Sequence, residues 1–141
     1  MQSPDYSQIE EKSWLAPTIS HTLAATVSLP GSKSLTNREL VLSALADGVS
    51  ELVAPLESRD SALMIEALSQ LGAKISKTAE GNTVIVPATT DIGVNTGIQC
   101  GLAGTVMRFI PPVAALFRGS ITFDGDLAAR ARPMATTITY R

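Results

Sequence analysis

Hydroxyl and cationic side chains cluster in the stretch PGSKSLTNR, residues 30–38. An apolar run precedes it and a helix-like run follows it, so we expect these residues at a strand-to-helix turn. Unpaired N–H groups at the start of a helix attract anions, and the helix dipole adds to the attraction. Ser34 supplies a hydroxyl, Lys33 a point charge and Arg38 a forked guanidinium suited to a carboxylate or phosphate. The stretch predicts an anion site, although a capped helix with solvated cations would show the same pattern.

Two further stretches combine glycines with arginines. GLAGTVMR, residues 101–108, opens a predicted helix, and Gly104 lacks a Cβ where the anionic end of a ligand would meet the backbone. DGDLAARARP, residues 124–133, joins an acidic turn to Arg130 and Arg132. The first stretch could serve packing alone, and the second could be an ordinary turn with internal ion pairs.

The composition limits the classes of protein that could carry such sites. The chain has 141 residues, of which 45% are apolar and 17% are charged, and its net charge is −2. This composition excludes a disordered chain, and the charge lacks the basic excess of a nucleic-acid-binding surface. No apolar run approaches the roughly 20 residues that span a bilayer. We therefore expect one folded cytoplasmic domain with neither nucleic-acid nor membrane partners.

The single cysteine and the single histidine restrict the chemistry further. One cysteine rules out a disulfide framework within the chain, and one of each nearly excludes a zinc site. The N-terminal sequence lacks the basic start and apolar core of a signal peptide. These features are typical of a cytoplasmic protein.

The spacing of apolar residues, with glycines and prolines between the runs, predicts alternating strands and helices that would position the three stretches. In the first helix, Leu35, Leu42 and Leu45 would share the buried face. Its N-cap would be Thr36, in a capping box, or Ser34. The expected elements are strands at 24–29, 50–54, 73–78, 83–86 and 120–123, and helices at 35–46, at 60–71 and from about 101.

The chain divides into a polar N-terminal tail, residues 1–22, and a folded part, residues 23–141. Within the folded part, Pro111 and Pro112 are expected to kink or restart the third helix. A further helix should begin after Pro133, close to the last residue given. We therefore expect the folded part to be truncated.

Four runs occur in an order and at a spacing that resemble the N-terminal part of the 5-enolpyruvylshikimate-3-phosphate synthase family, especially its actinobacterial branch: LPGSKSLTNRELVLSALADG, SRDSALMIEALSQLGAKI, CGLAGTVMRF and FDGDLAARARPM. The resemblance covers residues 23–135. It implies a mixed α/β (α+β) fold, part of a two-lobed inside-out α-β barrel built of repeated βαβαββ units. Helix starts would face the cleft between the lobes, and the chain would cross from one lobe to the other near residues 30–33.

The resemblance also implies an activity. The family transfers the enolpyruvyl group of phosphoenolpyruvate to the 5-hydroxyl of shikimate 3-phosphate and releases phosphate, as part of aromatic amino acid biosynthesis. It implies no cofactor and no metal, and full-length members are mostly monomeric. Both substrates are polyanions, which suits lone cations at helix starts. In the family the acid–base carboxylates lie beyond the position of Arg141, so we expect half a binding site and no turnover by this chain.

Matching the motifs position by position implies roles for four residues. Lys33 would be catalytic, because it would lie between the two substrates and stabilise charge in the tetrahedral intermediate. Ser34 and Arg38 would hold shikimate 3-phosphate. Gly104 would meet phosphoenolpyruvate through its backbone.

The arginine that would clamp phosphoenolpyruvate is harder to assign, because this chain departs from the pattern of many relatives. Ala128 replaces an arginine, Leu102 replaces an asparagine and Phe109 replaces a proline. The resemblance then assigns the clamp on phosphoenolpyruvate to Arg130, with Arg132 as the competitor.

Two alternative functions fit the same residues. The first is enolpyruvyl transfer to UDP-N-acetylglucosamine by the sister enzyme of the same fold. The second is a non-catalytic module that binds phosphate or carboxylate.

Overall fold

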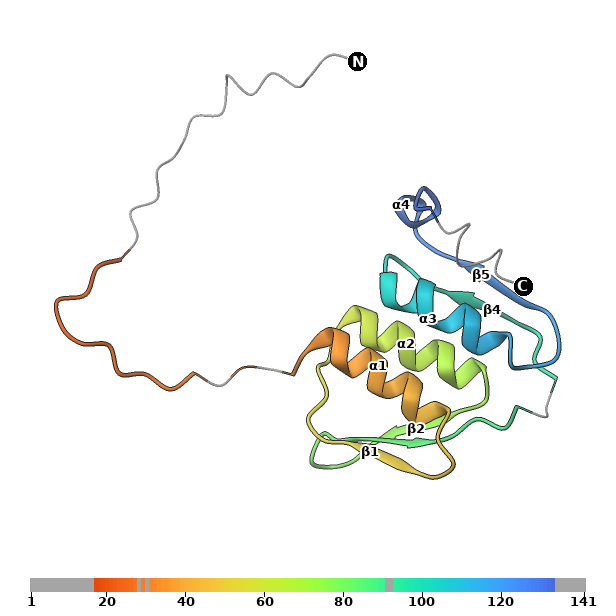
Figure 1. Ribbon diagram of the computed structural model, residues 1–141, viewed down its shortest axis with the longest axis horizontal. Coiled ribbons are helices and arrows are strands. Elements are labelled where there is room, and N and C mark those ends of the chain that lie inside the picture. The colour runs from red at the N-terminus through yellow and green to blue at the C-terminus, as the bar shows by residue number, and fades with distance from the viewer. Residues whose placement is uncertain (1–16, 28, 30, 91–92, 134–141) are drawn as a thin grey trace, which may run out of the picture.

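Three helices lie side by side in one layer, and the strands pack against it (Figure 1). The computed structural model describes residues 17–27, 29, 31–90 and 93–133. The helices of the layer are α1 (Lys33–Ala44), α2 (Arg59–Gln70) and α3 (Gly104–Ala114). A single further turn of helix, α4 (Leu127–Arg130), follows the last strand.

Helix α1 begins two residues earlier than predicted. Its N-cap is Ser32, whose Oγ accepts a hydrogen bond of 3.4 Å from Leu35 N. The predicted caps, Thr36 and Ser34, are therefore wrong. Thr36 is buried and its Oγ1 instead accepts a hydrogen bond from Leu56 N at 3.0 Å.

The predicted buried face of α1 is also wrong. Leu35, Leu42 and Leu45 are exposed, Leu42 to 67%. The helix turns another face toward the core, with buried residues Thr36, Asn37, Leu40, Ser43 and Ala44. Because α1 carries apolar side chains on both faces, periodicity alone could not identify the one that packs.

Helix α2 confirms its prediction closely. Ser58 caps it in a capping box with Ser61, which satisfies N–H groups at the helix start. Gly72 ends it with φ of 102°, and Ala73 N donates to Leu68 O at 3.0 Å, as in a Schellman motif. The predicted inward side chains are all buried: Met64, Ala67, Leu68 and Leu71.

One sheet has three antiparallel strands in the order β1-β3-β2, and it lies against α1 and α2. The strands are β1 (Ser50–Leu52), β2 (Lys74–Lys77) and β3 (Thr83–Val86). The predicted hairpin between β2 and β3 is confirmed, and Gly81 in its turn has φ of 85°. Ile85 of the central strand is fully buried against the helices.

A second, parallel pair of strands was predicted only in part. Strand β5 (Ile121–Asp124) falls where a strand was expected, whereas its partner β4 (Thr96–Gln99) was missed. Ile98 is the buried apolar residue of β4, and Gly97 has a low β propensity. The strand therefore depends on its pairing with β5 and carries little signal of its own.

Helix α3 begins later than predicted. It begins at Gly104, because Gly101 adopts φ of 52° and forms a turn before it. It then runs without a restart through Pro111 and Pro112, which lie in its second half. The helix continues through both prolines, although each proline removes one backbone N–H donor from it.

The segment before α1 contains no strand in its described residues, 17–27 and 29. The expected strand at 24–29 is therefore not formed there. A strand needs a partner for its ladder, and the strands described in this chain pair with one another. Most of the predicted tail and the helix expected after Pro133 lie outside the described residues, so the division at residue 22 stays a prediction.

The described helices include none that is both long and apolar enough to cross a membrane.

A glycine in the turn before β5 offers a test of the pairing between β4 and β5. Gly119 has φ of 125°, and a Cβ there would overlap the carbonyl of Val94. We expect Gly119→Ala to lower the free energy of unfolding, measured by urea denaturation, by roughly 1–3 kcal/mol. Gly48→Ala is the matched control, because a Cβ there meets nothing within 4 Å, and it should change stability by less than about 0.5 kcal/mol. Equal stability of the two variants would contradict the strained turn.

Candidate anion-binding site

The first turns of the three long helices meet at one end of the layer. In Figure 1 the helices run in the same direction and begin on the same side. Lys33 Nζ of α1 lies 3.1 Å from Asp60 Oδ2 of α2. Asn37 Nδ2 of α1 donates to Thr105 Oγ1 of α3 at 2.7 Å. Because each helix start carries a partial positive charge, this end of the layer favours anions.

The start of α3 differs from the starts of α1 and α2 because no side chain caps it. Its N-cap is Ala103, which is buried and whose methyl side chain cannot accept a hydrogen bond, whereas Ser32 and Ser58 cap the other two helices. Alanine at an N-cap costs about 1 kcal/mol relative to serine or asparagine. The first N–H groups of α3, from Gly104 onward, are therefore left for another acceptor.

Two guanidinium groups border the space above Gly104. A Cβ added at Gly104 would lie 3.0 Å from Arg108 Nη1 and 3.6 Å from Arg132 Nη1. Arg108 Nη1 donates to Gly104 O at 3.3 Å, and Arg132 Nη1 donates to Leu102 O at 3.0 Å. The glycine thus lets both guanidinium groups lie close to the first turn of α3, and both arginines are exposed there.

Arg130 is turned to a different partner. Its Nε and Nη2 donate to the two carboxylate oxygens of Asp124 at 2.9 and 2.8 Å. The Arg130 guanidinium, with the N–H of Gly125, holds the pKa of Asp124 below its usual value, and Asp124 raises the pKa of Arg130. This turn therefore forms an internal ion pair, which was one of the possibilities that the sequence allowed.

The other predicted residues lie on the first two turns of α1. Lys33 is 52% exposed in its side chain, and Asp60 holds its ammonium group at the start of α2. Ser34 is exposed. The Arg38 guanidinium carbon lies 6.0 Å from the centre of the Phe109 ring, at the distance of a cation–π contact, so Arg38 leans toward α3.

Sequence reasoning missed two residues that fix this end of the layer: Asp60, which pairs with Lys33, and Asn37, which links α1 to α3. Asp60 was read only as the start of a helix. Asn37 stands inside the PGSKSLTNR motif, but its partner Thr105 is 68 residues further along the chain. No local pattern joins them, although a polar side chain inside a helix after a glycine-rich turn is a signal that could have been followed.

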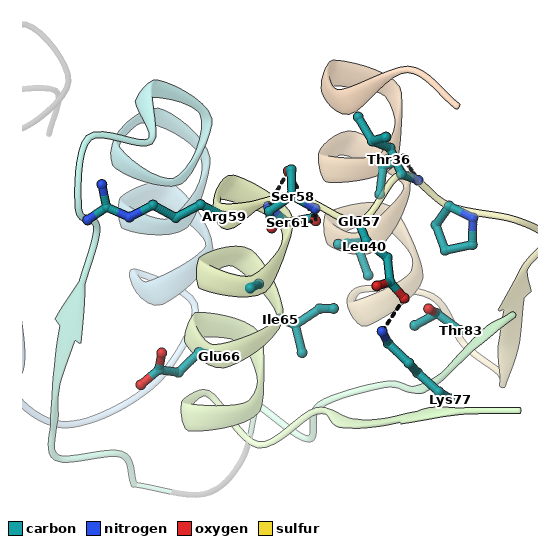
Figure 2. A pocket seen from close by; sticks show the side chains of 13 residues that line it. Thr36, Leu40, Glu57, Ser58, Arg59, Ser61, Ile65, Glu66, Lys77 and Thr83 are labelled. Carbon is teal, nitrogen blue, oxygen red and sulfur yellow. Dashed lines mark hydrogen bonds and ion pairs between the residues drawn. The ribbon is translucent and has the colours of Figure 1, made fainter. Parts of the chain in front are cut away.

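A groove lies between α1, α2 and the β2–β3 hairpin, and the first turn of α2 forms part of its lining (Figure 2). Leu40 and Ile65 give it apolar walls, and Lys77 forms an ion pair with Glu57 across it. Figure 2 shows Arg59 pointing away from the groove. Its lysine is neutralised and its walls are apolar, so this groove is a poor anion site compared with the space above Gly104.

Comparison with known proteins places the chain among transferases of one family. The sequence model of the family described as EPSP synthase (3-phosphoshikimate 1-carboxyvinyltransferase) matches residues 17–140. A 3-phosphoshikimate 1-carboxyvinyltransferase of Kocuria rhizophila is 45% identical over 144 aligned positions, which cover 94% of this chain and 32% of that protein. The chain therefore spans about a third of the length of this curated relative.

Solved structures show the same fold. Two structures of EPSP synthase from Acinetobacter baumannii match with a TM-score of 0.69 and 23% sequence identity, over 77% of this chain and 25% of theirs. The predicted mixed α/β fold is confirmed, and the chain represents part of that larger fold. The family model and the Kocuria relative confirm the resemblance read from the four sequence runs, and this chain belongs to the EPSP synthase family.

Proposed function

We propose that this chain supplies the part of an EPSP synthase site that binds the anionic ends of phosphoenolpyruvate and shikimate 3-phosphate. The uncapped start of α3 carries the proposal, because the guanidinium groups of Arg108 and Arg132 lie beside its first residue, Gly104. An anion there would accept hydrogen bonds from the helix start and charge-assisted bonds from the arginines.

Lys33 is the residue we assign to the reacting centre. It stands at the start of α1, and its ammonium group is held by Asp60 rather than left free to move. In the reaction of the family, enolpyruvyl transfer passes through a tetrahedral intermediate. A cation fixed before the reaction stabilises charge that develops there without further reorganisation.

Shikimate 3-phosphate is assigned to Ser34 and Arg38. Both are exposed on the first two turns of α1, on the side where Arg38 leans over Phe109 toward α3. The two substrates would then approach each other across the gap between the starts of α1 and α3. In this proposal Lys33 lies between them.

Arg132 is the better candidate for the clamp on phosphoenolpyruvate, and Arg130 is the alternative. Arg132 Nη1 lies next to the space above Gly104, whereas both carboxylate oxygens of Asp124 already engage Arg130. The bidentate pair holds the Arg130 guanidinium at Asp124 and offsets its charge, which lowers its attraction for a substrate anion. This difference favours the arginine that already faces the site.

Loss of the Lys33 charge tests the proposed site most directly. We expect Lys33→Ala to weaken binding of phosphoenolpyruvate, measured by isothermal titration calorimetry, by roughly tenfold or more, because a charge-assisted bond is lost. Lys74→Ala is the matched control, since Lys74 is an exposed lysine of β2, and it should leave the affinity unchanged. Equal affinity in all three proteins would contradict the site.

The two arginines can be separated by the same titration. We expect Arg132→Ala to weaken binding of phosphoenolpyruvate by roughly tenfold or more, and Arg130→Ala to have a much smaller effect. The reverse order would assign the clamp to Arg130. Unfolding by urea should accompany both titrations, so that a loss of folded protein is not mistaken for a loss of affinity.

Turnover is expected to require more of the fold than this chain contains, because the chain spans about a third of the relative that it matches. With shikimate 3-phosphate and phosphoenolpyruvate together, the chain should bind both but release no phosphate above background. Phosphate release at the rate of an intact enzyme would refute this. A parallel titration with UDP-N-acetylglucosamine should show no binding, and binding there would favour the sister activity.

A further inference from the structure

We propose that Asn37 is a positioning residue, whose buried amide fixes the start of α3 against α1 and so sets the place of the Gly104 backbone. The inference rests on the proposed function only for its effect on substrate. Its claim about the geometry of the helix starts does not depend on any ligand.

The contact between Asn37 and Thr105 is short and partly buried. Asn37 has 0% of its surface exposed, and its Nδ2 donates to Thr105 Oγ1 at 2.7 Å. Thr105 directly follows Gly104 in the first turn of α3. A shift of this bond therefore moves the residue next to the proposed anion site.

Asparagine at this buried position lowers the stability of the fold if its side chain only fills space. It has a low helix propensity, and a buried amide loses its hydration. Among the described residues, Asn37 Oδ1 finds no hydrogen-bond partner to compensate. An apolar side chain would pack there at lower cost, so the amide is best explained by the bond that it makes to α3.

A neutral bond suits this place better than an ion pair. The starts of α1 and α3 carry partial positive charges and nearby cations, which repel one another when no anion is bound. An ionic link between the helices would be weakened by salt, and an anionic substrate would compete for its cation. The Asn37–Thr105 bond avoids both effects and keeps the gap between the helix starts at a fixed width before binding.

A second partly buried hydrogen bond on the same turn of α1 provides a comparison. Thr36 Oγ1 accepts a hydrogen bond from Leu56 N at 3.0 Å, which ties α1 to the loop before α2 and not to α3. Thr36 and Thr105 therefore make bonds of the same kind with different consequences. Only the second should control Gly104.

The test compares three threonine variants of the whole chain. Thr105→Val removes the acceptor at constant shape, Thr105→Ser keeps it, and Thr36→Val removes the neighbouring bond. We expect Thr105→Val to weaken phosphoenolpyruvate binding about tenfold, Thr105→Ser to restore most of the affinity, and Thr36→Val to stay within about twofold of the parent. Urea denaturation should show that both valine variants lose similar stability, so stability cannot explain the difference.

A measurement without ligand separates this inference from the proposed function. The backbone amide resonance of Gly104 should shift in Thr105→Val and stay in place in Thr105→Ser and Thr36→Val. If this pattern appears while the parent chain binds no phosphoenolpyruvate, the positioning role stands and the proposed function fails. If the Gly104 resonance is unchanged in Thr105→Val, or if Thr36→Val moves it equally, the positioning role is overturned.

Discussion

Like charges meet where the three long helices begin, and the fold has to hold them together. The positive ends of three helix dipoles lie at one end of the layer, with several lysine and arginine side chains beside them. Two short contacts oppose the repulsion: the ion pair of Lys33 with Asp60 and the hydrogen bond of Asn37 with Thr105. The first neutralises charge and the second fixes distance. The helix starts thus remain close together despite their like charges.

Elements with one apolar face could be predicted from the sequence, and elements with two or none could not. Helix α2 has a single apolar stripe between a capping box and Gly72, so both its position and its buried face were predictable. Helix α1 has leucines on both sides, and the side that packs was predicted wrongly. Strand β4 contains one buried apolar residue, Ile98, and depends on a partner more than twenty positions away. Periodicity reports on local patterns, and these two elements are decided by their neighbours.

The site shows the same division between local and distant information. Lys33 and Gly104 stand in glycine-containing turns before helices, so the sequence alone predicted that they contact an anion, and this stays a prediction. The choice between Arg130 and Arg132 was not visible, because the two residues are two positions apart and differ only in their partners. Asp124 engages Arg130, and Leu102 O orients Arg132 toward Gly104. A long-range contact is needed to distinguish one arginine from the other.

Ala103 leaves the start of α3 without a side-chain cap, and this has a thermodynamic consequence. An anion that accepts hydrogen bonds from the start of α3 does what a serine or asparagine side chain would otherwise do. Because such an anion binds only the folded chain, occupancy of the site and stability of the fold become linked quantities. The ligand would then act as a removable cap for the helix, and the protein would be most resistant to unfolding in surroundings rich in the anions that it binds.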